Sequence, residues 1–315
     1  MAKRPDVFRT VRGGHTRAVT GLRQNSDGMV QPLDQVVYDG DTIQVNLLGS
    51  GSLRFLGIDT AELRLNNRLL DHPANVARFA DPAILDIAGI EPGLRDHLGL
   101  RIGPDTAPNQ LRHARLGQQA LAAMVQADMA ALGATPASFG LYLEFSYEVF
   151  DGNGRFLVFV NRDQPDATAG PRPLSYNERM LGAGMALPFF IWPNIAPFRD
   201  ARTVIDAIPA PGTLAALATR GKLGAARAMV KAARALAAPG TVFDPADRQL
   251  LEAFELRFLS RGELPSRGVI DLSVRSDIIL RPQSYHRIAL PEDRLFIPPE
   301  FVPAFAAKGW RLEGW

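Results

Sequence analysis

Short runs in which apolar and polar residues alternate dominate the first part of the chain. Ile43, Val45 and Leu47 alternate with polar neighbours, and turns rich in Gly, Asp and Ser flank them. Alternation of this kind is typical of a half-buried β-strand. Similar runs recur later and predict a meander of short strands. Strands are expected at residues 36–38, 42–48, 53–58, 141–149 and 156–161.

Apolar residues at helical spacing appear between and after these strands. Leu121, Met124 and Val125 share one helical face, and Gly133 is a stop signal, so a helix is expected over 114–132. Ser175 followed by Glu178 is a capping-box pattern. Further helices are expected at about 82–88, 92–98, 175–183, 212–236 and up to 260, with a strand at 269–274.

The order of these elements predicts the domain organisation. Three strands, a helix and two strands follow the order of a five-stranded Greek-key barrel of the OB type. Prolines cluster around residues 193–211 and indicate a boundary. The predicted fold is mixed α+β, with an OB-fold β-barrel and a mostly helical C-terminal region. Its parts are a lead-in at 1–30, the barrel domain at 31–195 with an insertion at 63–112, and a C-terminal accessory domain at 205–315.

Composition narrows the class of protein. The 315 residues include 35 Lys and Arg against 33 Asp and Glu, and 46% are hydrophobic, which excludes a disordered chain. With no cysteine there is no disulfide framework, thiolate zinc site or cysteine nucleophile. The N-terminus is charged and the apolar runs are shorter than a membrane span, so a soluble, cytoplasmic protein with no membrane partner is expected.

Charged residues gather at the turns of the predicted meander. Asp39, Asp41, Asp59 and Glu62 fall at strand ends, and Arg54 lies on the strand before Asp59. Carboxylate oxygens on turns suit a hard cation such as calcium, and a further carboxylate can activate water. Arginine presents a planar fork that matches phosphate oxygens. Each residue alone has a structural interpretation, but together they suit metal-assisted attack of water on a phosphodiester.

These residues stand in motifs that resemble those of the staphylococcal nuclease (thermonuclease) family. The chain reads D-G-D-T at 39–42 and R-F-L-G-I-D-T-A-E at 54–62, followed by G-R-F-L-V-F-V at 154–160. The family's small-residue helix is matched by L-G-Q-Q-A-L at 116–121, and its Asn-Glu helix by N-E-R-M-L at 177–181. The resemblance covers about residues 36–190.

The resemblance implies a reaction and a role for each matched residue. It implies calcium-dependent hydrolysis of DNA or RNA with little sequence preference, leaving 3′-phosphate ends, with one calcium ion per active site. The implied calcium ligands are Asp41, Asp59 and the backbone carbonyl of Thr60. The implied catalytic residues are Glu62 as general base and Arg54 and Arg155 as phosphate ligands, with Asp39 supporting the turn.

The chain also departs from the family's pattern. Ala61 replaces a proline, and Asn153 stands where the family often has tyrosine. The insertion at 63–112 is much longer than the family's loop, and we hypothesise that it forms a wall or lid over the site. A structural decoration away from the site is the alternative. Three histidines near the insertion lack metal-ligand spacing and are interpreted as surface or packing residues: His72, His97 and His113.

A basic helix is predicted in the C-terminal region. No acidic residue occurs from 207 to 243, and four basic residues fall on one face of the predicted helix: Arg220, Arg227, Lys231 and Arg234. Such a face suits a nucleic-acid backbone, although a solvated face of an ordinary amphipathic helix has the same pattern.

Two other functions remain open from the sequence. One is a catalytically inactive OB module that binds nucleic acid or a protein partner. The other is an effector whose C-terminal region senses a ligand or partner. The C-terminal region is also a candidate contact for a homo-oligomer or a regulatory partner. The nuclease is favoured because the chain retains Asp41, Arg54, Asp59, Glu62 and Arg155. The sequence does not distinguish DNA from RNA as substrate.

Overall fold

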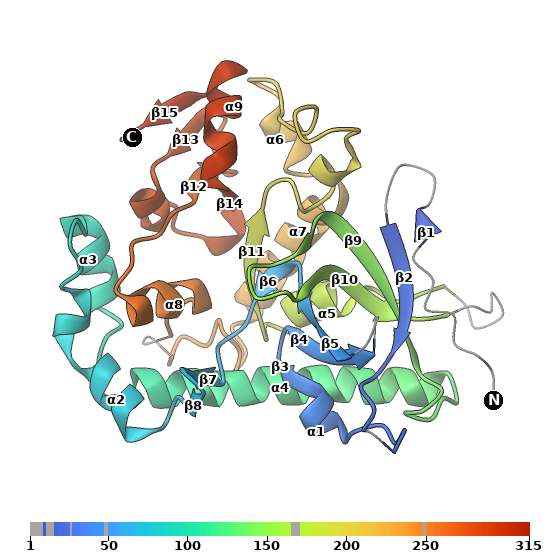
Figure 1. Ribbon diagram of the computed structural model, residues 1–315. Helices are drawn as coiled ribbons and strands as arrows, with labels where there is room; N and C mark the ends of the chain where they lie inside the picture. Colours follow the sequence, from blue (N-terminus) through green and yellow to red (C-terminus); the bar gives the residue numbers. More distant parts are fainter. Residues whose placement is uncertain (1–8, 11–15, 26, 47–49, 165–170, 248–249) are drawn as a thin grey trace.

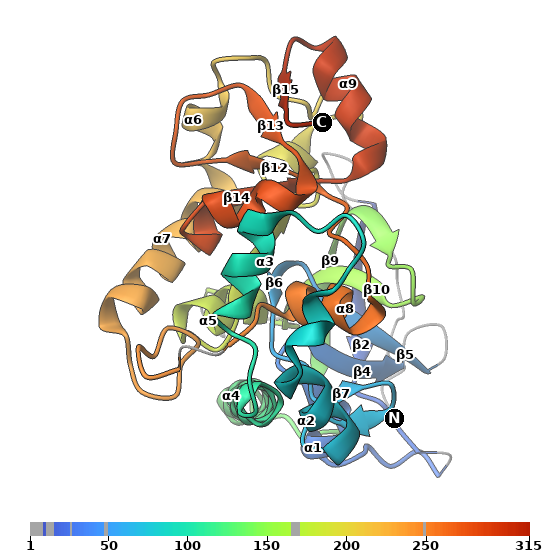
Figure 2. The ribbon, with the colours of Figure 1, turned by 90° about the vertical axis from the view of Figure 1, so that its left-hand side faces the viewer.

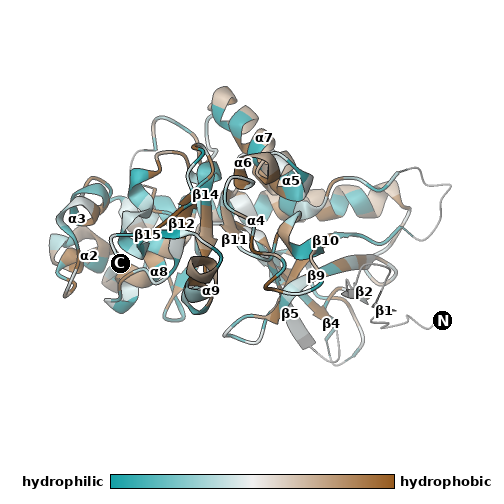
Figure 3. Ribbon diagram, turned by 90° about the horizontal axis from the view of Figure 1, so that it is seen from above, coloured by the Kyte–Doolittle hydropathy of each residue, from teal (hydrophilic) through white to brown (hydrophobic). Residues whose placement is uncertain are grey.

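The computed structural model has a mixed α+β fold in which two β-sheets lie above one long helix, α4 (Thr106–Ala131) (Figure 1). It describes residues 9–10, 16–25, 27–46, 50–164, 171–247 and 250–315. Figure 3 shows strands of the first sheet on one side and strands of the second sheet on the other. None of the described helices is long and apolar enough to cross a membrane.

The first sheet has seven strands in the order β1-β2-β9-β10-β5-β4-β3. The strands are β1 (Arg9–Thr10), β2 (Thr16–Gly21), β3 (Val37–Asp39), β4 (Thr42–Asn46), β5 (Ser50–Phe55), β9 (Gly140–Phe150) and β10 (Phe156–Arg162). β10 pairs in parallel with β5, and the other pairs are antiparallel. An isolated bridge joins Leu22, just past β2, to Val45 of β4. Within the described residues the sheet does not close into a barrel.

Most of the predicted strands are confirmed in this sheet. The strand expected at 42–48 is β4, and its last two positions lie outside the described residues. The strand expected at 53–58 is wrong as one element, because Gly57 has φ +76° and turns the chain out of β5. Glycine accepts this left-handed conformation without a steric penalty. The chain then continues as β6 (Gly57–Asp59), which belongs to the second sheet.

The second sheet combines strands from both halves of the sequence, in the order β15-β13-β12-β14-β11-β6. The other strands are β11 (Leu187–Ile191), β12 (Gly268–Asp271), β13 (Ile278–Leu280), β14 (Arg294–Ile297) and β15 (Arg311–Glu313). β11 pairs with β6 on one side and with β14 on the other. The division into domains at 31–195 and 205–315 therefore stays a prediction, and one sheet runs across its boundary.

Helices cover both sheets, and their ends follow local signals. The remaining helices are α1 (Leu33–Val36), α2 (Pro73–Ala80), α3 (Pro92–Gly99), α5 (Tyr176–Gly182), α6 (Leu214–Leu217), α7 (Gly221–Leu236), α8 (Ala253–Arg261) and α9 (Val302–Ala307). Ser175 and Glu178 make both capping-box hydrogen bonds, which confirms the predicted start of α5. The helix predicted at 212–236 is broken before α7, because Arg220 is extended and Gly221 has φ +58°.

The predicted helix at 114–132 starts earlier than expected. α4 already begins at Thr106, inside the predicted insertion, and Pro108 lies in its first turn. Proline is tolerated there because the first N–H groups of a helix have no intrahelical partner. The rest of the insertion forms the β7–β8 hairpin (Arg64–Leu65 and Arg68–Leu69), α2 and α3.

The insertion shares a hydrophobic core with the C-terminal region. Leu85, Leu94 and Leu98 belong to the same buried cluster as Leu256 and Tyr285. Figure 2 brings α2, α3 and α8 to the front of the molecule. Burial of apolar side chains is the main favourable term in folding, so these two segments stabilise each other.

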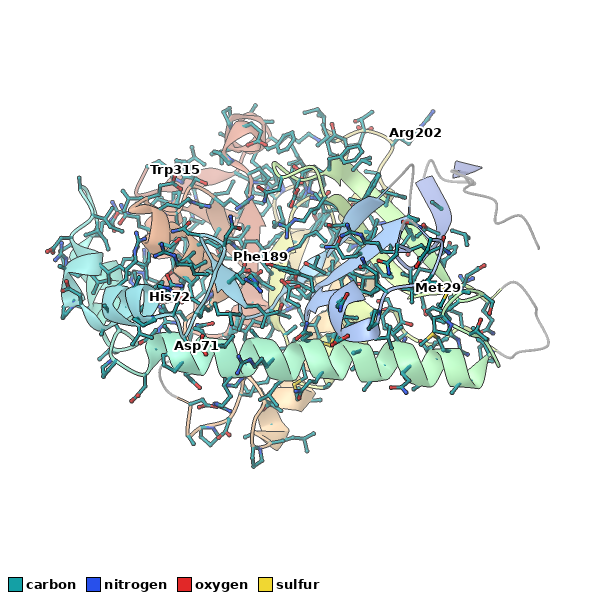
Figure 4. All side chains as sticks on the ribbon, turned by 60° about the horizontal axis from the view of Figure 1, so that its bottom comes forward. Met29, Asp71, His72, Phe189, Arg202 and Trp315 are labelled. Atoms are coloured by element: carbon teal, nitrogen blue, oxygen red, sulfur yellow. The ribbon has the colours of Figure 1, made fainter. Side chains whose placement is uncertain are left out.

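The three histidines named above make structural contacts. His72 caps α2, its Nδ1 accepting a hydrogen bond from the Ala74 backbone N–H at 3.2 Å. His113 is buried, and its Nε2 lies 2.8 Å from Asp247 Oδ2. His97 Nε2 lies 3.4 Å from a carboxylate oxygen of α8. The packing interpretation accounts for their positions, and Figure 4 places His72 near the N-terminal end of α4.

Candidate active site

The Asp-Gly-Asp turn between β3 and β4 is packed against α4. A Cβ atom at Gly40 would lie 2.8 Å from Cγ2 of Thr60 and 3.2 Å from Cα of Gly117 in α4. Two glycines therefore meet where the turn touches the helix. This contact explains why the small-residue helix motif and the acidic turn occur together in one sequence.

Gly40→Ala should lower the free energy of unfolding by about 1–3 kcal/mol, because the added methyl group overpacks a contact with backbone on one side. Gly152→Ala is the matched control, since a Cβ there meets nothing within 4 Å. Urea denaturation of both variants measures the difference. Equal stabilities would show that the turn moves away from α4 at little cost.

Arg54 joins two buried aspartates at the centre of the site. Its Nη1 donates to Asp41 Oδ1 and its Nη2 donates to Asp59 Oδ1. Asp41 also accepts hydrogen bonds from the Thr60 backbone N–H at 3.0 Å and from the Thr42 hydroxyl at 3.1 Å. The turn after β5 at Gly57 brings these groups together, because it places Arg54 and Asp59 on the two sides of one bend.

Glu62 and Asp59 share a second arginine, Arg257 of α8, which sequence reasoning missed. Arg257 Nη1 donates to Glu62 Oε1 at 2.7 Å and to Asp59 Oδ1 at 3.1 Å, and its Nη2 donates to Asp59 Oδ2 at 2.7 Å. No motif links α8 to the meander, because the contact spans almost two hundred positions of the chain. Only the packing of the C-terminal region brings this residue to the site.

Burial and ion pairing act in opposite directions on the charged groups of the site. Burial raises the pKa of Asp59, but Arg257 and Arg54 outweigh it and hold the pKa below its usual value. Burial alone would lower the pKa of Arg54, and the carboxylates of Asp41 and Asp59 raise it instead. Asp59 and Arg54 therefore remain charged near neutral pH.

Asp39 differs from its neighbours. Its side chain is buried and its Oδ1 accepts a hydrogen bond from the Asp41 backbone N–H at 3.3 Å. Burial, followed by the negative charges of Asp41 and Glu62, raises the pKa of Asp39 well above its usual value. The position agrees with the predicted role of supporting the turn behind Asp41.

Arg155 lines the same cavity as Arg54. It follows the hairpin turn between β9 and β10, where Asp151 accepts hydrogen bonds from the Arg155 backbone N–H at 2.9 Å and from its Nε at 2.7 Å. A cavity of about 360 Å³ is lined by Arg54, Arg155 and Arg257, and also by Asn153. The structure thus brings together both arginines that the motifs predicted.

The donor atoms around Arg54 suit a divalent cation that prefers oxygen. The three carboxylates of Asp41, Asp59 and Glu62 exceed the two guanidinium groups of Arg54 and Arg257 by one negative charge. Thr60 Oγ1 is buried without a hydrogen-bond partner among the described residues. In the structure both aspartates are ion-paired with Arg54. The described residues contain no group of three or more acidic, His or Cys side chains placed to hold a metal. An ion between Asp41 and Asp59 therefore requires Arg54 to move aside.

The predicted basic face of α7 is divided in the structure. Arg227 is buried, where its Nη2 donates to Asp293 Oδ1 at 2.5 Å and its Nε to the Glu292 carbonyl at 3.0 Å. Arg234 forms an ion pair with Glu292. Arg220 and Lys231 are exposed. The helix therefore does not present four basic residues on one exposed face, because two of them hold it against the C-terminal region.

Comparison of the sequence with protein-family models gives no match, and a search of curated proteins gives none either. The basis for assigning a function is therefore the residues of the site and their geometry.

Proposed function

We propose that the chain is a calcium-dependent nuclease that hydrolyses phosphodiester bonds of DNA or RNA with little sequence preference and leaves 3′-phosphate ends. One observation carries this proposal. Asp41, Asp59 and Glu62 lie directly behind Arg54 and Arg257, which line a cavity together with Arg155. Carboxylates that can bind a cation and activate water thus lie next to guanidinium groups that can bind a phosphate. Hydrolysis of a phosphodiester requires both kinds of group.

The arrangement of the first sheet supports an OB-type fold for this part of the chain. The order β2-β9-β10-β5-β4 with a parallel β10–β5 pair agrees with a five-stranded Greek-key barrel. The bridge between Leu22 and Val45 lies where the first and second strands of such a barrel would close. We propose a partly open OB barrel of the staphylococcal nuclease type.

The proposed mechanism assigns one task to each group. Glu62 takes a proton from the attacking water as the new P–O bond forms and the bond to the 5′ oxygen breaks, and the 5′ oxygen leaves as a hydroxyl with a proton from solvent water. Arg54 and Arg155 donate hydrogen bonds to the phosphate oxygens, on which negative charge builds in the transition state. Calcium held by Asp41, Asp59 and the Thr60 carbonyl would withdraw charge from the phosphate and promote ionisation of water.

A second function is favoured by a specific contact. Arg54 and Arg257 engage all three carboxylates of the site. If these ion pairs persist in solution, Glu62 cannot act as a base and the two aspartates cannot bind an ion. The protein would then be an inactive OB module that binds nucleic acid or a protein partner.

Digestion of plasmid DNA and of a structured RNA distinguishes the two functions. We expect cleavage with millimolar calcium and loss of cleavage with excess chelator, because two aspartates alone do not polarise the phosphate. Products should carry 3′-phosphates, which a 3′-phosphatase converts into primers for a polymerase. Undiminished cleavage in chelator would contradict the calcium mechanism, and binding without cleavage would establish the inactive module.

A further inference from the structure

Two cavities meet at the arginines of the site. The cavity of about 360 Å³ described above and one of about 530 Å³ beside α8 share four lining residues: Phe189, Arg257, Arg261 and Arg267. Figure 4 places Phe189 of β11 near the centre of the molecule. The larger cavity is well within the size range of sites that hold small organic ligands.

The larger cavity has an aromatic wall. Phe189 and Phe254 are stacked, with ring centroids 5.4 Å apart and an interplanar angle of 19°. Phe296 packs against both rings, at centroid distances of 4.9 Å and 5.4 Å. Phe189 and Phe254 are only half-buried, whereas Phe296 is buried. Two apolar rings therefore border the cavity instead of being enclosed in the core.

The residues shared by the two cavities include an arginine that makes no ion pair with any described residue. Arg257 has two carboxylate partners, and Arg261 pairs with Glu263. Arg267 forms no ion pair with another residue in the described part of the chain, and its guanidinium lies 5.8 Å from the Phe189 ring centroid. Arg267 is exposed and can therefore contact a negative charge of an occupant whose flat apolar group lies on the aromatic wall.

We infer that the larger cavity binds the base of a nucleotide whose phosphate contacts Arg267. This inference rests on the proposed function, and it adds a substrate class: an unstacked nucleotide of a single strand, as opposed to a base within a duplex. A base in a duplex must first leave its stack, which costs free energy, whereas a base that is already free does not bear this cost and gains the stacking on protein aromatics in full. The insertion contributes to selection, because Ile87 and Ala88 also line the cavity.

Binding of a labelled twelve-nucleotide single strand, measured by fluorescence anisotropy in chelator, tests the inference without turnover. Phe254→Leu should weaken binding by about 10-fold to 100-fold, because it removes one stacking surface, and should leave the salt dependence unchanged. Arg267→Gln should weaken binding by about 10-fold and reduce the slope of log K against log salt by about 0.7, the share of one phosphate contact. Phe301→Leu and Arg275→Gln are the matched controls, neither of which lines either cavity.

Different ligands distinguish a single strand from a duplex and from a free nucleotide as the occupant of the cavity. A duplex of the same length and an abasic strand should bind more weakly than the single strand, and the abasic strand should be insensitive to Phe254→Leu. Competition by a mononucleotide at micromolar concentration would support the cavity and identify free nucleotides as its ligand. Equal binding of abasic and intact strands, or unchanged binding by both variants, would overturn the inference. If the parent protein does not cleave nucleic acid but both variants still bind the strand more weakly, the proposed nuclease is refuted and the nucleotide-binding cavity stands.

Discussion

Glu62→Gln is expected to reduce the rate of phosphodiester hydrolysis by about 10²–10⁴-fold, the usual contribution of a general base. A carboxamide cannot take the proton of the attacking water. Its carbonyl oxygen can still accept the hydrogen bond that Arg257 Nη1 donates to Glu62 Oε1 at 2.7 Å. The loss should therefore appear in kcat and not in the fold, and initial rates across the pH range with saturating calcium measure it.

Glu313→Gln is the matched control for this result. Glu313 is a half-exposed glutamate that also pairs with an arginine, at 2.9 Å from Arg287, and it lines neither cavity. It should retain the activity of the unaltered protein, since no reacting atom lies near it in the proposed mechanism. Equal activity of both variants and the parent protein would contradict the role of Glu62 as general base.

Glu255→Gln should lower the free energy of unfolding by about 3–5 kcal/mol at neutral pH, the usual effect of breaking a buried ion pair. Glu255 is fully buried on α8 and accepts hydrogen bonds from Arg101 Nη1 at 2.7 Å and Nη2 at 2.8 Å. The Tyr285 hydroxyl donates a further hydrogen bond at 2.6 Å. Removing the negative charge leaves Arg101 largely buried without a counter-charge, and chemical denaturation measures the loss.

The stability difference between the parent protein and Glu255→Gln should also depend on pH, in a direction that the pKa of Glu255 determines. Burial raises the pKa of Glu255, but Arg101 and then His97 outweigh burial and hold the pKa far below its usual value. A carboxyl with a lowered pKa in the folded state stabilises the fold above its unfolded pKa of about 4.3, and this stabilisation is lost as the pH falls below that value. The stability difference between parent and variant should therefore shrink in acid.

The exposed ion pair between Arg287 and Glu313 supplies the control for this experiment. Both side chains are about half exposed, so Glu313→Gln should change stability by less than about 1 kcal/mol at any pH. A pH-independent difference between the parent and Glu255→Gln would contradict the buried ion pair as the cause. The result bears on the active site as well, because Arg257 follows on the same helix and reaches Asp59 and Glu62.

Local sequence patterns were sufficient to predict the strands and helix ends that depend on neighbouring residues. Alternation over 141–149 and 156–161 predicted β9 and β10, and the capping box at Ser175 predicted the start of α5. Such features depend on turn chemistry and on periodicity within a few residues. The break before α7, at Arg220 and Gly221, was missed because a single glycine within an alanine-rich run does not by itself indicate the end of a helix. Intrinsic propensity is a weak guide where tertiary contacts decide the backbone.

The sequence by itself determined the acidic turn, the strand that carries Arg54 and the hairpin that presents Arg155, because each depends on residues close together in the chain. The bend at Gly57, which ends that strand early, was not predicted. Only the tertiary structure decided which groups complete the site. Arg257 reaches Asp59 and Glu62 because the second sheet joins β6 to strands of the C-terminal region and because Glu255 anchors α8 to the insertion. Contacts between residues so far apart arise from the burial of shared apolar surface, and periodicity along the chain does not encode which distant faces will meet.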